Sequence, residues 1–307
     1  MKHYLRTVML LLAGWGYSLT GFGQQPAMFT QYMFNGLAIN PAYAGSHGAL
    51  SVTALARKQW TGFEGSPFSQ TFSAHTPVRL KNIAAGALFT HDHIGVTDQT
   101  GMTLSGAYQI RFAKSVLSLG AQGGLSYYRI SPEELFVRHS TDPTFADGDF
   151  SRTMPVVGTG LYYYSDRFYL GLSVPQLLRP SFGTAGQLVD QLPRHYFLTS
   201  GYVFDLGRSL KLKPNVLVTA VEGTHLGIDL NTNLLIKEVL WVGASYRSFE
   251  SVDAMLELQL TDQFRLGYSY DFVTAARTNR VNTGSHELML NYRFSFAKTR
   301  LVTPRYF

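Results

Sequence analysis

The chain has 307 residues, of which 26 are basic and 20 acidic, and it contains no cysteine. The absence of cysteine excludes disulfides and thiolate metal sites, and a formal net charge of +6 is too small to indicate a nucleic-acid partner. Only 15% of the residues are charged whereas 14% are aromatic, which is typical of a protein whose aromatic side chains lie at two lipid–water boundaries.

Residues 1–23 predict a cleaved secretory signal peptide. Lys2 and Arg6 precede an apolar run over residues 8–17, and the small residue Gly23 ends the segment. The run is shorter than the roughly 20 apolar residues that a transmembrane helix needs. Because no cysteine follows the run, a lipid-modified N-terminus is excluded. A retained N-terminal anchor is the less favoured alternative.

Residues 24–48, which we call the leader, show no regular alternation and contain turn-forming pairs such as Asn35-Gly36 and Asn40-Pro41. The leader nevertheless has too many apolar side chains for a free tail in water. We therefore expect it to be buried within the rest of the chain or against a partner. Its candidate partner-binding residues are Tyr32, Phe34, Asn35, Asn40, Pro41 and Tyr43.

From residue 49 onward, apolar and polar positions alternate over short segments, as in β-strands that turn one face to lipid. In the segments 102–110, 252–260 and 264–272, charged and amide side chains share the face opposite the large apolar ones. The predicted strands lie near 49–60, 68–77, 83–92, 101–111, 116–130, 153–164, 167–174, 195–206, 210–220, 224–236, 239–249, 252–260, 263–272 and 286–296.

About fourteen strands, an even number, fit a bacterial outer-membrane barrel. A soluble two-sheet sandwich would also alternate, but the signal peptide, the aromatic content and the scarcity of charges favour the membrane. The predicted fold is all-β, a transmembrane antiparallel β-barrel over residues 24–307 with the leader in or under it, where it plugs or lines the periplasmic mouth. Counted from a periplasmic N-terminus, the long connections 131–152 and 175–194 are extracellular. The tail 297–307 is then a candidate periplasmic docking segment.

Three motifs have residue types that can form sites of chemistry. His91-Asp92-His93 offers too few ligands on one strand face for a metal, since metal sites need three or four. Ser285-His286-Glu287 places neighbouring side chains on opposite faces of a strand, which spoils the geometry of a catalytic triad. The glycines within 120–124 and 158–160 lie inside strands and do not open helices, so they do not predict a phosphate site. The sequence predicts no catalysis, metal or cofactor.

Trp60 follows a basic strand end, Arg57-Lys58-Gln59, which is typical of an anchor at the membrane boundary. A contact with a partner protein is the alternative interpretation of Trp60. Arg305, Tyr306 and Phe307 at the end of the tail are further candidates for partner binding.

Several segments, in order along nearly the whole mature chain, match one known family. They are residues 31–46 (QYMFNGLAINPAYAGS), 57–63 (RKQWTGF), 66–70 (SPFSQ), 92–95 (DHIG), 171–176 (GLSVPQ), 195–197 (HYF), 241–247 (WVGASYR), 268–271 (YSYD), 284–287 (GSHE) and 304–307 (PRYF). On these residues the sequence resembles the PorP/SprF family of type IX secretion system membrane proteins.

The resemblance implies an outer-membrane barrel that supports the type IX secretion machine of Bacteroidota without being its main conduit. It implies a role in exporting or attaching surface proteins, including adhesins in gliding members. The implied partners are C-terminal domains of cargo proteins, periplasmic components associated with peptidoglycan, and outer-membrane lipid. The alternative function is an outer-membrane channel for small or hydrophobic solutes, which has the same fold and would need an open lumen.

Overall fold

The alternating segments form antiparallel strands. The computed structural model describes residues 28–78, 82–131, 150–179, 193–222, 224–248, 250–274 and 283–294, together with short strands at 181–182 and 189–191. Three single 3-10 turns come first: η1 (Tyr32–Phe34), η2 (Gly36–Ala38) and η3 (Pro41–Tyr43). The strands are β1 (Leu50–Lys58), β2 (Phe68–Pro77), β3 (Ile83–Ile94), β4 (Thr97–Arg111), β5 (Ser115–Ile130), β6 (Phe150–Ser165), β7 (Phe168–Val174), β8 (Ser181–Phe182), β9 (Val189–Gln191), β10 (His195–Tyr202), β11 (Phe204–Asp205), β12 (Leu210–Val221), β13 (Gly227–Ile236), β14 (Leu240–Arg247), β15 (Ser251–Gln259), β16 (Phe264–Val273) and β17 (Ser285–Phe294).

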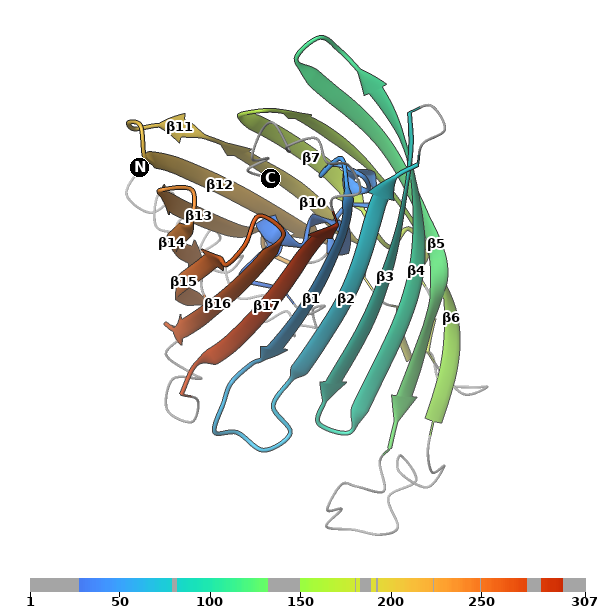
Figure 1. Ribbon diagram of the computed structural model, residues 1–307. Coiled ribbons are helices and arrows are strands. Elements are labelled where there is room, and N and C mark those ends of the chain that lie inside the picture. Colours follow the sequence, from blue (N-terminus) through green and yellow to red (C-terminus); the bar gives the residue numbers. More distant parts are fainter. Residues whose placement is uncertain are drawn as a thin grey trace, which may run out of the picture.

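Fourteen of the described strands close into one antiparallel barrel, which confirms the predicted fold (Figure 1). The ring closes where β1 pairs with β17, from Leu50 opposite Phe294 to Lys58 opposite His286. β10 pairs directly with β12, because the two-residue β11 only extends the end of β12. β8 and β9 form a separate pair of strands. Closure satisfies the backbone hydrogen bonds that lipid could not satisfy.

The apolar faces of the strands point outward. Met102 and Leu104 on β4 are 58% and 60% exposed, whereas Thr103 between them is buried. Leu288 and Leu290 on β17 are likewise exposed. A soluble sandwich would bury these faces between its sheets, so the outward apolar surface identifies a barrel that lies in a membrane. Within the described residues, no helix has the length and apolar character needed to cross a membrane.

The strand boundaries depart from the predicted ones mainly at one end of the barrel. β3 and β4 were expected to stop at 92 and to start at 101, but they pair as far as Ile94 opposite Thr97 and turn at Gly95, whose φ is +59°. Polar cross-strand contacts replace the apolar pattern there: His93 Nδ1 lies 2.8 Å from Asp98, and His91 Nδ1 lies 3.0 Å from the Thr100 hydroxyl. Cross-strand polar pairs extend a sheet without leaving a hydrophobic signature.

The two ends of the barrel differ in their connections. One end, which we call the loop end, carries the β5–β6 and β7–β10 connections, whereas the other, the turn end, carries short turns such as that between β4 and β5. In Figure 1 the turn end is at the top and the β1–β2 connection marks the loop end at the bottom. Outer-membrane barrels place long connections outside the cell and short turns in the periplasm. We therefore assign the loop end to the cell surface.

Candidate functional site

The inner wall of the barrel is chemically asymmetric. From β2 to β10 the inward residues are mainly serine, threonine, glycine and aromatic side chains, such as Thr71, Ser105 and Tyr162. From β12 through β17 to β1 the inward side chains include most of the buried charges. These are Arg57, Lys213, Asp229, Arg247, Asp253, Glu257, Arg265, Asp271 and Glu287. Burial of so many charges requires partners inside the barrel.

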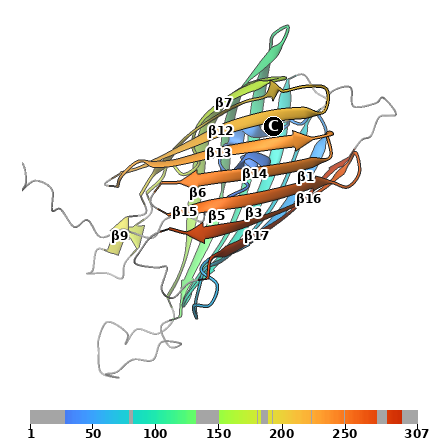
Figure 2. The ribbon, with the colours of Figure 1, turned by 90° about the vertical axis from the view of Figure 1, so that its left-hand side faces the viewer.

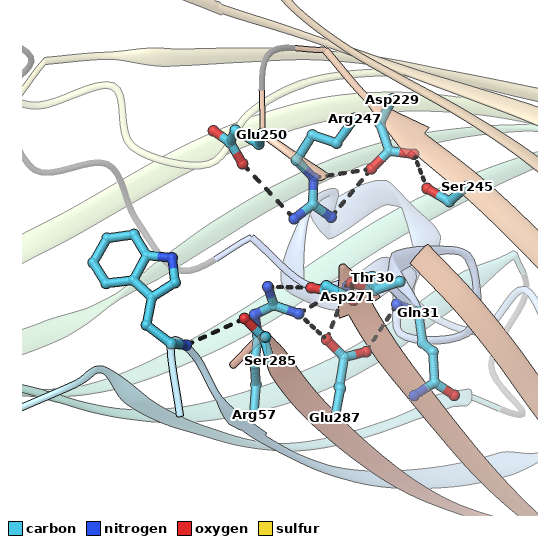
Figure 3. Close-up of polar contacts among 12 residues, drawn as sticks. Thr30, Gln31, Arg57, Asp229, Ser245, Arg247, Glu250, Asp271, Ser285 and Glu287 are labelled. Atoms are coloured by element: carbon cyan, nitrogen blue, oxygen red, sulfur yellow. Dashed lines mark hydrogen bonds and ion pairs between the residues drawn. The ribbon is translucent and has the colours of Figure 1, made fainter. Parts of the chain in front are cut away.

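Some of these partners belong to the leader. The Glu287 carboxylate accepts the backbone N–H groups of Thr30 and Gln31, each at 2.8 Å. Arg57 forms ion pairs with Asp271 at 2.5 Å and with Glu287 at 3.3 Å, and these three side chains are at most 3% exposed. The Thr30 hydroxyl bridges Asp271 and Arg57, because it donates to Asp271 at 2.9 Å and accepts from Arg57 at 3.0 Å (Figure 3). The start of the leader is thus held by three strands that close the barrel.

A second arginine network lies beside the first on the same wall. Arg247 pairs with Asp229 at 3.1 Å, and the Ser245 hydroxyl donates to the same carboxylate at 2.9 Å (Figure 3). Arg265 pairs with Glu257 at 3.2 Å nearer the turn end. A buried pair whose remaining lone pairs are hydrogen-bonded is costly to break, because the surviving partner is left as an unpaired charge.

The middle of the leader bonds to the uncharged wall. The Asn35 amide donates to Thr71 at 3.0 Å and accepts from Ser73 at 2.8 Å. The Asn40 amide donates to the Leu161 carbonyl at 2.9 Å, while its own carbonyl accepts the backbone N–H of Ala42 at 2.9 Å and so caps η3. Asn40 thus satisfies irregular backbone of the leader, whereas Asn35 joins the leader to hydroxyl groups of β2.

Aromatic packing fills the space around these bonds. The ring of Phe34 lies edge-on to Trp241, with 6.2 Å between centroids, and Lys213 Nζ lies 5.1 Å above the Phe34 ring. Tyr43 packs edge-on against Tyr162 and bonds to His47 Nε2 at 2.9 Å. Burial raises the pKa of the Tyr43 phenol, so this hydroxyl stays neutral inside the lumen. Figure 2 shows the blue turns of the leader enclosed behind β13 and β14.

A cavity of about 210 Å³ remains between the leader and the wall that runs from β2 to β10. Its lining is mostly apolar and includes Phe29 and Ile39 of the leader, together with Leu88 and Phe197 of the wall. Ala42 and Tyr43, further along the leader, are only 0% and 3% exposed. The leader is therefore tightly packed at these two residues.

Sequence comparison decides the family. The family described as type IX secretion system membrane protein PorP/SprF matches residues 21–292. The chain belongs to the PorP/SprF family. It is therefore a membrane component of the type IX secretion system, located in the outer membrane. The family consists of secretion membrane proteins and is not a known enzyme family. No curated protein shows significant sequence similarity to this chain.

Solved structures share the barrel of this PorP/SprF protein at low sequence identity. The CymD monoaromatic hydrocarbon channel has a TM-score of 0.50 at 12% identity, over 89% of this chain and 95% of its own. Omp33 of Acinetobacter baumannii has a TM-score of 0.47 at 12% identity, over 80% and 98%. A TodX deletion mutant, also a monoaromatic hydrocarbon channel, has a TM-score of 0.48 at 11% identity, over 84% and 94%. At 12% identity, the likeness to CymD shows the fold alone.

The structure locates the site residues that the PorP/SprF sequence predicted. Six leader residues, Tyr32, Phe34, Asn35, Asn40, Pro41 and Tyr43, are all buried in the lumen. Of the two expected locations, inside the barrel or against a partner, the structure thus shows the first. Trp60 lies apart from them at the loop end, and Arg305, Tyr306 and Phe307 lie outside the described residues.

The leader also reaches further than predicted. It was expected at the periplasmic mouth, but it extends from Thr30, bound near the loop end, to His47, whose ring lies 3.2 Å from Arg293 at the turn end. The reason is the buried charge at the loop end, since Glu287 and Asp271 recruit the first backbone and hydroxyl donors of the described leader. In the sequence, Glu287 belongs to an excluded triad, and both Asp271 and Glu287 lie in segments that match a known family, but neither was predicted to bind the leader. A usable signal was the presence of Asp271 and Glu287 at inward positions of alternating strands, where a charge requires a partner inside the barrel.

The two motifs examined for catalysis or metal binding have other roles. His91 and His93 bond to Thr100 and Asp98 of the neighbouring strand. In Ser285-His286-Glu287, His286 is exposed on the outer face while its two neighbours are buried on the inner face. Over the described parts of the chain, no group of three or more histidine, aspartate or glutamate residues could hold a metal ion.

Substitution of Gly120 by alanine is expected to displace the leader. A Cβ at Gly120 would overlap the backbone of Ala42, and a strand cannot move away as a flexible side chain could. Overpacking of this kind costs about 1–3 kcal/mol. Gly123, on the same strand, has no atom within 4 Å of the added Cβ, so Gly123→Ala is a matched control with an expected change within about 0.5 kcal/mol. Urea unfolding of the two variants in detergent measures the difference, and equal midpoints would contradict the close approach.

Proposed function

We propose that this protein is an accessory component of type IX secretion that binds other proteins and does not conduct solutes. It would contact C-terminal domains of exported proteins at the loop end and periplasmic, peptidoglycan-associated components at the turn end. Export or surface attachment of a particular set of proteins would then depend on it.

The observation that supports this proposal is the position of the leader inside the lumen. A solute channel needs a continuous water-filled bore, and the number of strands here leaves an interior wide enough for one only if nothing fills it. Instead, the leader is bonded to both walls of the lumen and its side chains are almost completely buried. A barrel that is filled in this way offers its two ends as binding surfaces.

Deletion of the gene tests the proposed function. The proteins displayed at the surface or released are compared by mass spectrometry in the deletion strain, the wild type and the complemented strain. Selective loss of one or a few exported proteins, restored by the wild-type copy, is the expected result. An unchanged surface proteome together with impaired uptake of a solute would contradict the proposal and favour a channel.

The tail 297–307 is proposed as part of the periplasmic docking surface. Replacing Arg305, Tyr306 and Phe307 by alanine is expected to reduce the recovery of periplasmic secretion components in a pull-down by about tenfold, as for loss of a small cluster of anchor side chains. The folded barrel, recognised by its heat-dependent shift on gels, should remain intact. Undiminished recovery of the same components would exclude the tail from this interface.

A further inference from the structure

The β1–β2 connection at the loop end is a fixed structure and is a separate feature from the leader. We call residues 59–67 the rim loop. The backbone N–H of Gln59 donates to the Pro67 carbonyl at 2.9 Å, and Lys58 Nζ donates to the Ser66 carbonyl at 2.9 Å. These bonds tie the two ends of the loop together, so that its apex is presented in one conformation.

Neighbouring connections hold the rim loop from both sides. Thr61 exchanges backbone hydrogen bonds with the β16–β17 connection, as donor to Gly284 at 2.8 Å and as acceptor from Thr283 at 3.0 Å. On the other side, the N–H of Gly95 in the β3–β4 turn donates to the Gly65 carbonyl at 2.9 Å. Fixing an exposed loop costs conformational entropy, and functional residues are commonly placed on loops that a rigid scaffold holds.

The fixed loop exposes two aromatic side chains. Trp60 is 38% exposed and Phe63 is 55% exposed. Trp60 has a φ of +54°, which is unusual for a bulky residue, and its backbone N–H donates to the Ser285 hydroxyl at 3.2 Å. Such strained conformations persist only where the surroundings enforce them, and they are concentrated at functional sites. The backbone contacts therefore determine where these aromatic rings are displayed.

We propose that the rim loop is the docking surface for an exported protein. This proposal rests on the proposed function and identifies the part of the loop end that binds the exported protein. The partner would present an apolar patch to Trp60 and Phe63, with a basic side chain beside it for the exposed Glu64. Among the described residues Glu64 forms no ion pair, so its carboxylate is available for such a side chain. Aromatic side chains of this kind dominate the binding free energy of protein interfaces.

The alternative occupant of this surface is the membrane boundary, where tryptophan often lies. Two features favour the protein partner. An interfacial anchor requires no particular backbone conformation, whereas Trp60 is held in a strained one. Glu64, directly after Phe63, also adds an exposed carboxylate that can pair with a basic side chain of a protein but not with an acyl chain. Insertion of these rings into lipid is therefore the outcome that the experiments must separate from docking.

The first experiment substitutes Trp60 and Phe63 in the complete protein in its host. The double variant Trp60→Ala, Phe63→Ser is compared with Leu226→Ser, a control at an equally exposed apolar residue in another loop-end connection, itself 58% exposed. In the double variant, the surface amount of the exported proteins that gene deletion removes should fall about tenfold. In the control, the surface amount of these proteins should remain unchanged. Both variants should contain equal amounts of folded barrel. If gene deletion removes these exported proteins from the surface but the double variant keeps them there, the proposal of docking at the rim loop is wrong and the proposed function stands. If deletion removes none, the proposed function itself fails.

The second experiment asks whether Trp60 lies in lipid. After cleavage of the signal peptide, Trp60 and Trp241 are the two tryptophans of the chain, so Trp241→Phe leaves Trp60 as the single emitter. The protein is reconstituted into phosphatidylcholine vesicles with and without brominated acyl chains. Docking to a protein requires that bromination leave the emission of Trp60 nearly unchanged. Strong quenching would place the ring among acyl chains and would overturn the proposal.

Discussion

Replacement of Arg57 by leucine is expected to release the start of the leader from the barrel wall. The substitution leaves Asp271 and Glu287 without their cation, although both are almost completely buried. Breaking a buried ion pair by removing one partner typically costs about 3–5 kcal/mol. The barrel itself should persist, because its strands are held by backbone pairing, which does not depend on the side chain of Arg57. The substitution should therefore mainly destabilise the bound state of the leader.

A single cysteine can report this release, since the chain has none of its own. Met33→Cys places a thiol in η1, at a position that is 5% exposed. If the bound state of the leader loses about 3 kcal/mol of stability, the population of the released state rises about a hundredfold, because each 1.4 kcal/mol changes an equilibrium tenfold. The maleimide labelling rate of this thiol should rise by the same factor. Arg167→Leu is the matched control: its pair with Asp205, at 2.5 Å, is exposed to solvent, and such pairs contribute about 0–1 kcal/mol. Equal labelling in both variants would mean that other contacts hold η1.

Removal of residues 28–45 is expected to convert a closed barrel into a conducting pore. The deletion takes away η1, η2 and η3, which fill the lumen between the charged wall and the hydroxyl-rich wall. The charges of Arg57, Asp271 and Glu287 would then face water, which solvates them and stabilises an open bore. Planar-bilayer recordings should show a steady current for the deletion variant and none for the wild type.

A replacement of residues 28–45 by a glycine–serine segment of equal length is the control for this experiment. It restores chain length without the side chains of Asn35, Asn40 or Phe34, so it should also conduct, with a noisier current. A closed deletion variant would show that another part of the chain blocks the lumen. A steady current through the wild type would contradict the proposed function and favour the channel.

The strands were predictable because their signal is local. The alternation in segments such as 102–110 and 286–294 depends only on neighbouring residues, and it correctly placed Leu104 and Leu288 outside and Thr103 inside. The tips of β3 and β4 were missed because polar pairs hold them together. The path of the leader was beyond prediction for a different reason, since Thr30 and Glu287 are 257 residues apart in sequence. Their contact depends on ring closure and on register, and neither is encoded within one strand.

Ring closure also sets an order of events during assembly. The site that binds Thr30 and Gln31 is built from Arg57 on β1, Asp271 on β16 and Glu287 on β17, the first strand and the last two. In an open sheet, before β1 has met β17, Arg57 is far from Asp271 and Glu287, and the site is incomplete. The leader is made first but can be seated only last. An occupied lumen is therefore a property of finished barrels, and incomplete ones would expose an unseated, apolar leader to periplasmic chaperones and proteases.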